Sequence, residues 1–303
     1  MVDLARLAEH EHATGVAGPI HAPAAPVPDP ELSVVVPVHN EAENIRPLID
    51  ETVRALDGVA AFEIVYVDDC SSDATPEALA AARQSAPMLR VLRHAQPMGQ
   101  SAAVTSGVLA ARGQWIATLD GDGQNDPADI PRLLERAREL AQARGEDAVL
   151  IAGWRNQRRD SWYTRTQSRL ANGVRSRLLH DGTPDTGCGL KLYSRALFLR
   201  LPNFDHMHRF MPALAQRAGA GVQSVPVNHR PRTRGRSHYG MLNRLWAGVV
   251  DTAGVMWLAR RARRPDALEV GLEAAAVQQA PPDAAARAPA AAHEAPRSAA
   301  PGA

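Results

Sequence analysis

The chain of 303 residues has little cysteine, few aromatic residues and a single lysine, Lys191. Its two cysteines, Cys70 and Cys188, lie far apart and outside any CxxC pattern. This excludes a disulfide-stapled scaffold and disfavours a zinc site. Phe, Trp and Tyr make up only 4% of the residues. Because proteins that bind nucleic acid commonly stack bases on such side chains, we expect no nucleic-acid partner.

We also expect neither a signal peptide nor a membrane-spanning helix. The first residues contain no basic stretch followed by an apolar core. The longest apolar run, residues 245–259, includes Asp251 and is shorter than the about 20 residues that a span needs. We therefore expect a chain in the reducing cytoplasm.

Composition divides the chain into four segments. Residues 1–30 and 265–303 are rich in Pro, Ala and small polar residues, and we expect both to be disordered. Residues 31–239 are long enough for one domain with a full core. Residues 240–264 predict an amphipathic helix that ends in a run of arginines. We expect this helix to lie in a membrane interface, at the cytoplasmic face, although a helix packed on the domain would have the same pattern.

Apolar runs and helical patterns alternate along the first half of the chain. The runs are short and rich in β-branched residues, as in buried strands, and cover residues 32–38, 62–67, 88–92, 115–119 and 148–152. This alternation predicts an α/β fold with a mostly parallel sheet flanked by helices. The second half is less regular, and there we expect a basic helix at 164–180, a strand at 188–193, a helix within 202–217 and an edge strand at 222–227.

Arginine is concentrated in two parts of the second half. Residues 151–180 contain seven arginines and residues 228–264 contain nine, whereas the first half carries most of the carboxylates. Such asymmetry is typical of proteins with a polyanionic partner, for example a diphosphate, a nucleic acid or an anionic membrane, and the scarcity of aromatic residues disfavours the nucleic acid. A general preference for arginine over lysine also contributes to the count.

The run Asp120-Gly121-Asp122 follows a predicted strand directly. Two carboxylates separated by one small residue are able to turn toward the same cation, and Gln124 offers a further oxygen. Mg²⁺ and Mn²⁺ prefer oxygen ligands and commonly share them with substrate phosphates. By itself the pair also fits a helix cap or a solvated loop.

Seven segments occur in a fixed order: VVVPVHNEAENI, IVYVDDCSSDAT, WIATLDGDGQNDP, AGWR, SRLAN, DTGCGLKLYSR and HRPRTRGRSHYG. Together they resemble the family 2 glycosyltransferases of GT-A (Rossmann-like) fold, and more narrowly the dolichol- or polyprenyl-phosphate mannosyltransferases. The resemblance covers roughly residues 31–260. It implies a metal-dependent, inverting transfer of a hexose from a nucleotide sugar to a polyprenyl or dolichyl phosphate. Mannose from GDP-mannose is favoured, and glucose from UDP-glucose is the second choice.

The resemblance also implies roles for individual residues. The nucleotide sugar would contact Pro37, Asn40, Glu41, Asp69, Asp120 and Gly121, with Asp69 accepting from the base. The divalent cation, Mg²⁺ or Mn²⁺, would be held by Asp120, Asp122 and Gln124. The catalytic set would be Asp122, Arg155 and Arg232, with Arg155 facing the diphosphate or the acceptor phosphate and Arg232 closing over the site.

The acceptor phosphate would lie beside Ser168 with Arg165 or Arg169. A phosphate monoester is largely ionised at neutral pH, so we expect no catalytic base. His238 stands where the family usually has lysine, which replaces a fixed charge with a titratable one. Many relatives continue into transmembrane helices. Here we expect either the terminal helix or a separate integral membrane protein to hold the chain at the membrane.

Other functions stay open at this point. A family 2 enzyme that acts on a soluble saccharide would need a carboxylate base, and the second half offers few carboxylates near its motifs. A sugar-nucleotide-binding pseudoenzyme would be expected to lose its metal ligands. A nucleotidyltransferase would need a Gly-rich loop that VVPVHNEAEN lacks. Asp185 and Thr186 would orient the acceptor or fix a turn, and both interpretations remain.

Overall fold

A single mixed sheet organises the chain. The computed structural model describes residues 29–145, 148–155, 178–179, 181–231 and 241–261. Seven strands are ordered β3-β2-β1-β4-β6-β5-β7. Their bounds are β1 Leu32–Val38, β2 Phe62–Asp68, β3 Leu89–Arg93, β4 Trp115–Thr118, β5 Val149–Arg155, β6 Lys191–Ser194 and β7 Gly221–Val227.

The sheet is mostly parallel, as the alternating pattern predicts. Strands β3, β2, β1 and β4 run parallel to one another, and β5 runs parallel to β7. Strand β6 pairs antiparallel with both β4 and β5 and so joins the two halves. Strand β7 lies at the edge, where the sequence places it. The predicted α/β architecture with a mostly parallel sheet is therefore confirmed.

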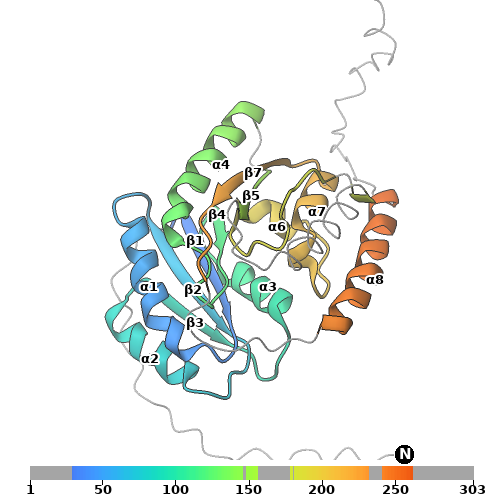
Figure 1. The fold of residues 1–303 in the computed structure, drawn as a ribbon. Helices are drawn as coiled ribbons and strands as arrows, with labels where there is room; N and C mark the ends of the chain where they lie inside the picture. Colours follow the sequence, from blue (N-terminus) through green and yellow to red (C-terminus); the bar gives the residue numbers. More distant parts are fainter. Residues whose placement is uncertain (1–28, 146–147, 156–177, 180, 232–240, 262–303) are drawn as a thin grey trace, which may run out of the picture. The chain divides into compact units, whose positions relative to one another are not determined.

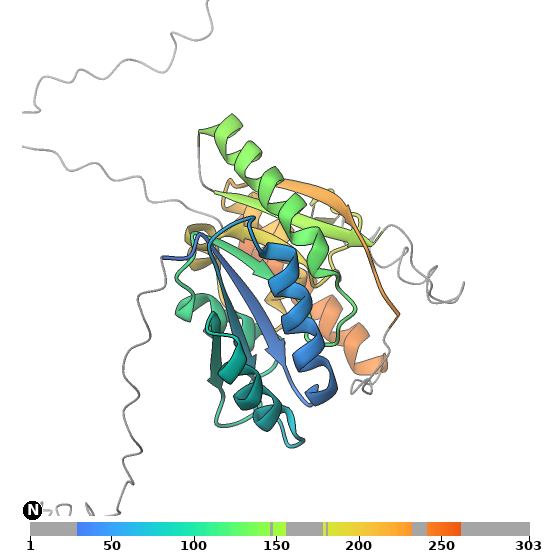
Figure 2. The ribbon, with the colours of Figure 1, turned by 90° about the vertical axis from the view of Figure 1, so that its left-hand side faces the viewer.

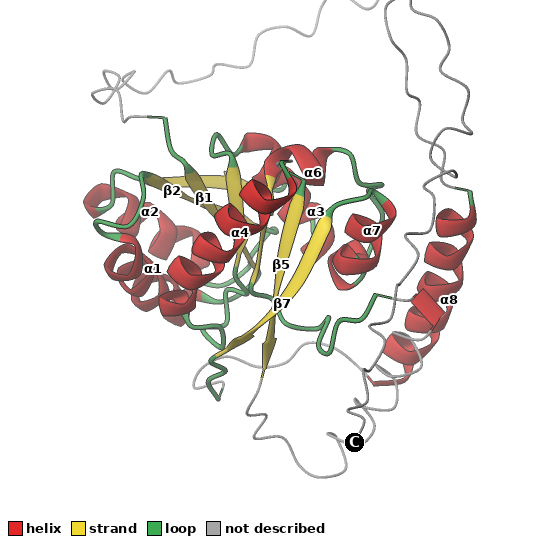
Figure 3. Ribbon diagram, turned by 90° about the horizontal axis from the view of Figure 1, so that it is seen from above, coloured by secondary structure: helices red, strands yellow, loops and turns green. Residues whose placement is uncertain are grey.

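Helices cover both faces of the sheet (Figures 1 and 3). Their bounds are α1 Ala42–Leu56, α2 Thr75–Ser85, α3 Gln100–Ala110, α4 Ile130–Arg144, α6 Arg195–Leu199, α7 Met211–Arg217 and α8 Met241–Arg260. Two 3₁₀ turns, η2 at Pro127–Asp129 and η3 at Met207–Arg209, precede α4 and α7. The short helix α6 has no counterpart in the sequence prediction. Of the expected basic helix at 164–180, only residues 178–179 lie within the described part of the chain.

Two apolar cores lie on opposite faces of the sheet. One joins the strands to α1, α2 and α4, with Ile45 and Leu133 fully buried; Figure 2 looks onto this side. The other joins the strands to α3, α6 and α7, with Val108 and Leu214 fully buried. This arrangement leaves the ends of the strands uncovered by helices, which is where parallel sheets bind ligands.

Helix α8 follows the domain and contacts it through a few side chains. Val255 is 2% exposed and belongs to the core on the α7 side. Arg217 Nε donates to the Leu258 carbonyl oxygen at 3.0 Å, and His206 Nδ1 lies 3.0 Å from Asp251 Oδ2. Among the described residues, no helix is both long and apolar enough to cross a bilayer.

Glu63 in β2 holds together the amino-terminal edge of the sheet. Its buried carboxylate accepts hydrogen bonds from Ser33 Oγ at 2.7 Å, Arg90 Nη1 at 2.8 Å and the Arg112 main-chain N–H at 2.6 Å. Burial acts to raise the pKa of Glu63, but these donors outweigh it and hold the pKa below the ordinary value. The ionised carboxylate therefore stabilises the fold.

We predict that Glu63→Gln lowers the free energy of unfolding by about 1–3 kcal/mol at neutral pH, because charged hydrogen bonds to buried groups are lost. The folded pKa is depressed, so this contribution is present above the ordinary pKa of 4.5 and fades as the pH falls below it. Denaturant unfolding at several pH values measures both effects. Asp50→Asn, which breaks an exposed ion pair with Arg46, should change stability by only about 0.5 kcal/mol or less. An equal loss in Glu63→Gln at pH 3 and pH 7 would contradict the account.

Candidate active site

The carboxyl ends of β1, β2 and β4 bring the predicted donor residues to one edge of the sheet. In the parallel register Val38 lies beside Asp68, and the Asp69 N–H donates to the Val38 carbonyl oxygen at 2.9 Å. Leu119 donates to the Val35 carbonyl oxygen on the other side of β1 at 3.2 Å. Asp69 and Asp120 therefore follow the two strands that flank β1, although they are 51 positions apart in the sequence.

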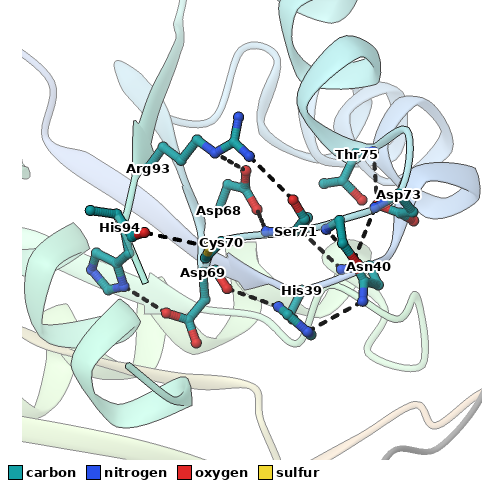
Figure 4. A network of polar contacts seen from close by, with 12 residues as sticks. His39, Asn40, Asp68, Asp69, Cys70, Ser71, Asp73, Thr75, Arg93 and His94 are labelled. Carbon is teal, nitrogen blue, oxygen red and sulfur yellow. Dashed lines mark hydrogen bonds and ion pairs between the residues drawn. The ribbon is translucent and has the colours of Figure 1, made fainter. Parts of the chain in front are cut away.

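Asp69 is the centre of a hydrogen-bond network at this edge (Figure 4). Its Oδ1 lies 2.7 Å from His94 Nδ1 and accepts from the Met98 N–H at 2.8 Å, and its Oδ2 accepts from the Gly99 N–H at 2.8 Å. Burial acts to raise the pKa of Asp69, but His94 and the two main-chain donors hold it below its ordinary value. A carboxylate offers about four acceptor positions, so a further donor is still accommodated.

His94 extends this network into helix α3. Its Nε2 lies 2.9 Å from Ser106 Oγ, while Nδ1 contacts Asp69. The arrangement ties the ends of β2 and β3 to the helix that follows them. The sequence gives no signal for this pairing, because the three residues share no motif and meet only in the fold.

The loop after β1 is fixed to the loop after β2 through Asn40. Asn40 has a positive φ of 56°, which asparagine tolerates better than most residues. Its Oδ1 accepts from the Ser72 N–H at 2.8 Å, and its own N–H donates to Ser71 Oγ at 2.9 Å (Figure 4). Glu41 is joined to the same segment, since its N–H donates to Thr75 Oγ1 at 2.9 Å. Pro37 stands beside Val67 in the strand pair that carries both loops.

The two carboxylates of Asp120-Gly121-Asp122 lie in the turn after β4. Asp120 Oδ1 accepts from Gln100 Nε2 at 2.8 Å, and Asp122 Oδ1 accepts from the Gln124 N–H at 3.1 Å. A Cβ on Gly121 would lie 2.4 Å from Val38 Cγ1, so only glycine lets the turn pack on β1. The turn geometry is therefore set by close packing as well as by hydrogen bonds.

The residues at this turn fit a divalent cation. Burial and the nearby charge of Asp122 raise the pKa of Asp120 to about 6, against the opposing effects of Lys191 and Arg155. Two close carboxylates that disfavour each other's charge are the environment that a bound cation relieves. Within the described residues, no group of three or more His, Cys, Asp or Glu side chains is arranged to hold a metal ion, so a site here would need the amide of Gln124, water or phosphate as further ligands. The set of Asp120, Asp122 and the Gln124 amide oxygen therefore suits Mg²⁺ or Mn²⁺, which complete their shells with phosphates and water.

Arg155 is held in place by Asp185. Arg155 Nε and Nη2 donate to the two Asp185 oxygens at 2.6 Å and 2.9 Å, and the Arg155 N–H donates to Oδ2 at 3.3 Å. Asp185 is 5% exposed. Burial acts to lower the pKa of Arg155, and the pairing with Asp185 raises it instead. Asp185 therefore orients the Arg155 guanidinium at the end of β5.

Arg230 ties the chain after β7 to the Asp120-Gly121-Asp122 turn and to α1. Its Nη1 donates to Glu51 Oε2 at 2.7 Å, and its Nη2 lies 2.6 Å from Asp126 Oδ1. The Arg230 N–H donates to the Gln124 carbonyl oxygen at 3.0 Å. Asp126 also accepts from the Ala128 N–H and so caps the 3₁₀ turn η2. The remaining predicted residues Ser168, Arg165, Arg169 and Arg232 lie outside the described residues.

A narrow pocket beside Asp120 contains residues that the sequence analysis did not select. Its polar lining includes Lys191, Tyr193, His208 and Gln100. Gly189 forms part of the wall, and a Cβ at this position would lie 2.1 Å from Asp120 Oδ2. The one sequence feature that points to this pocket is its lysine, since the chain otherwise uses arginine.

A comparison with protein families identifies the family to which the chain belongs. The family model described as Glycosyl transferase family 2 matches residues 33–201. A dodecaprenyl-phosphate galacturonate synthase of Rhizobium johnstonii is 34% identical over 255 residues, which cover 82% of this chain and 72% of that protein. The chain therefore belongs to glycosyl transferase family 2.

A second group of relatives is similar over a shorter region. The undecaprenyl-phosphate 4-deoxy-4-formamido-L-arabinose transferase of Edwardsiella ictaluri is 36% identical over 214 residues, covering 70% of this chain. The match spans 63% of the length of that protein, so less than two thirds of it has a counterpart here. Both relatives carry a polyprenyl phosphate in their names, and the motifs resemble enzymes that act on the same class of acceptor.

Solved structures with the same fold include ligand-bound glycosyltransferases. A glucosyl-3-phosphoglycerate synthase from Mycobacterium tuberculosis, solved with Mn²⁺, UDP-glucose and glycerol 3-phosphate, has a TM-score of 0.56 and 18% identity over 81% of this chain and 88% of that one. A mannosyltransferase from Pyrobaculum calidifontis, solved with GDP-mannose and Mn²⁺, has a TM-score of 0.53 and 18% identity over 82% of this chain and 70% of that one. These similarities confirm the GT-A fold.

We predict that Gly189→Ala weakens Mn²⁺ binding by about 10–100-fold, because the new methyl group displaces the Asp120 carboxylate. Isothermal titration calorimetry with MnCl₂ measures the change, and circular dichroism checks the fold. Gly254→Ala is the matched control, since a Cβ there meets no atom within 4 Å. Unchanged Mn²⁺ affinity in a folded Gly189→Ala protein would show that Asp120 is not a metal ligand.

Proposed function

We propose that this protein transfers a sugar from a nucleoside diphosphate sugar to a polyprenyl phosphate with the help of Mg²⁺ or Mn²⁺. The observation that carries the proposal is the joint placement of Asp69 and the Asp120-Gly121-Asp122 turn at the carboxyl edge of β1, β2 and β4. The names of the relatives support a polyprenyl phosphate acceptor, because both contain one. The Mn²⁺-bound structures support a cation in the reaction.

The sugar is the open part of the proposal. The motifs favour mannose, with glucose as the alternative, and GDP-mannose and UDP-glucose are the corresponding donors. The two relatives carry galacturonate and 4-deoxy-4-formamido-L-arabinose in their names, and neither is a mannosyltransferase. The donor is therefore best identified by testing mannose and glucose beside acidic and amino sugars.

In the proposed reaction, an oxygen of the acceptor phosphate attacks the anomeric carbon as the bond to the diphosphate breaks. A single displacement of this kind inverts the anomeric centre. Asp120, Asp122 and Gln124 would hold the cation, which neutralises charge on the departing diphosphate when bound. Arg155, oriented by Asp185, would face the same phosphates, because a planar guanidinium suits phosphate oxygens.

The contacts of the nearby carboxylates support a reaction without a catalytic base. Asp126 caps η2 and pairs with Arg230, and Asp185 is bound on both oxygens by Arg155. Neither carboxylate is placed to receive a proton without losing a structural contact. An ionised phosphate acceptor needs no such group. We include Ser168 with Arg165 or Arg169 as the acceptor-phosphate residues, and Arg232 as the residue that closes over the site.

Helix α8 supports a membrane surface as a further partner. Val250 is 50% exposed and Trp257 is 61% exposed, and they are seven residues apart, so they lie on the same face of the helix. Val255 points to the domain core instead. Arg260 and Arg261 are exposed at the end of the same helix. We propose that this face contacts the headgroup region of an anionic membrane, with or without a separate integral membrane protein.

We predict that purified protein moves radiolabelled sugar from a nucleotide sugar into a short-chain polyprenyl phosphate, and that EDTA stops the transfer. GDP-mannose, UDP-glucose and UDP-galacturonate are tested in parallel by extraction into organic solvent. Asp122→Ala should lower the rate by at least about 100-fold, because charge on the leaving diphosphate is no longer neutralised. Asp57→Ala, at the exposed end of α1, is the matched control and should retain the wild-type rate.

Two results would contradict this proposal. Transfer to a soluble saccharide with none to the lipid would favour the alternative acceptor class. Nucleotide-sugar binding without any transfer in the presence of cation would favour a pseudoenzyme.

We predict that the protein floats with vesicles containing phosphatidylglycerol and not with purely zwitterionic vesicles. Val250→Ser combined with Trp257→Ser should reduce flotation about tenfold or more, since two apolar side chains no longer enter the interface. Leu109→Ser, which changes a 59% exposed leucine on α3, is the control and should float as the wild type does. Equal flotation of all three proteins would exclude this face of α8 as the membrane contact.

A further inference from the structure

The pocket beside Asp120 lies on the side of the sheet that α3 and α7 cover. Its walls come from strands β4 and β6, from the first turns of α3 and from the η3–α7 segment. Val104 and Met211 are apolar wall residues that also belong to the core on this side. The pocket thus opens next to the proposed metal turn and is otherwise enclosed by core residues.

Lys191 is the only lysine of the chain, and it is 4% exposed. Its Nζ donates to the Cys188 carbonyl oxygen. Among the described residues, no carboxylate lies within ion-pair distance of this ammonium group. Burial lowers the pKa of Lys191, and the more distant charges of Asp120 and Asp185 only partly offset this effect. Because the chain has no other lysine, the compact ammonium group of a lysine side chain occurs only at this pocket, and guanidinium groups are used elsewhere.

Tyr193 follows two residues later on the same side of β6 and is 1% exposed. Its ring stacks on Phe198 with a centroid distance of 5.4 Å, which fixes its orientation. The Tyr193 hydroxyl has no hydrogen-bond partner within the described part of the chain. Buried hydroxyl groups are usually paired, so an unpaired one in a pocket indicates a place for a ligand atom.

His208 adds an uncharged imidazole to the same lining. Its main-chain N–H donates to Ser101 Oγ at 3.5 Å, and Ser101 Oγ lies 2.7 Å from His208 Nδ1. Ser101 therefore engages Nδ1 and holds the ring in place. Burial lowers the pKa of His208 to about 3, so the ring stays uncharged at neutral pH.

We propose that this pocket receives a carboxylate substituent of the donor sugar, and that the donor is a nucleoside diphosphate uronic acid. The inference rests on the proposed function, because it assumes that a nucleotide sugar binds at Asp120 and Asp122. A carboxylate would pair directly with the Lys191 ammonium, which Asp120 and Asp185 affect only from a longer distance, and would offer acceptor oxygens to the Tyr193 hydroxyl. A sugar hydroxyl at this position would leave the buried ammonium without an ion-pair partner in direct contact.

The composition of the lining argues against a phosphate in this pocket. No arginine lines it, although arginine is the abundant cation of the chain and the better match for phosphate oxygens. Asp120 is the one carboxylate in the lining, and Gln100 and the proposed cation already engage it. A small anionic group of one charge fits this arrangement better than a diphosphate does.

The test compares matched pairs of donors that differ only in the carboxylate. UDP-galacturonate with UDP-galactose, UDP-glucuronate with UDP-glucose, and GDP-mannuronate with GDP-mannose are titrated into the full-length protein with Mn²⁺ by calorimetry. For at least one pair, the wild type should bind the acidic sugar about tenfold or more tightly than the neutral one, because a charged hydrogen bond to a buried group is gained. UDP and GDP alone are titrated as references.

Two variants separate the pocket from the nucleotide site. Lys191→Met should abolish the preference for the acidic sugar while leaving the affinity for the nucleoside diphosphate unchanged. Tyr193→Phe, which removes one oxygen, should reduce the preference several-fold. Tyr66→Phe is the matched control, since the Tyr66 hydroxyl is also buried without a partner among the described residues but does not line the pocket. It should keep the full preference.

The outcomes distinguish this inference from the function on which it rests. Equal affinity for acidic and neutral sugars in every pair, with normal nucleotide binding, would overturn the inference and leave the proposed function in place. Weaker binding of UDP or GDP itself in Lys191→Met would assign the lysine to the diphosphate and also overturn it. Absence of any nucleotide binding would overturn both.

Discussion

The shared carboxyl edge of β2, β1 and β4 is the constraint on which the rest of the site depends. Parallel pairing places the ends of these strands at one edge, so Asp69 and Asp120 lie on either side of the end of β1 although they are far apart in the sequence. The loops that leave this edge are then held by their own hydrogen bonds, through Asn40 on one side and Gln100 on the other. A site for a charged ligand is thereby built from short loops on a rigid frame.

Charge at this edge is balanced by pairs and not by isolated groups. Arg155 is held by Asp185, and Arg230 joins Glu51 to Asp126 beside the Asp120-Gly121-Asp122 turn. These pairs orient the two guanidinium groups. Asp120 and Asp122 repel each other, which a divalent cation would relieve. The arrangement is consistent with the proposed transfer, because the departing diphosphate brings negative charge to the same place.

The sequence predicts the frame better than it predicts the contacts within the site. Strand β1 begins and ends at the predicted residues, because its β-branched run is flanked by polar loops. Helix α6 is missed, since five residues are too few to show helical periodicity. The network of Asp69 with His94 and the pocket at Lys191 are also missed. Both join residues that meet only after the sheet has formed, and no local pattern encodes such meetings.

The central claim is that the Asp120-Gly121-Asp122 turn and the Asp69 network form one metal-dependent nucleotide site. Calorimetric titration of UDP and GDP into the full-length protein, with Mn²⁺ and then with EDTA, tests it most directly. The account predicts one nucleoside diphosphate bound per chain in the presence of Mn²⁺ and no measurable binding with EDTA. Equal affinity under both conditions, or no binding under either, would contradict it.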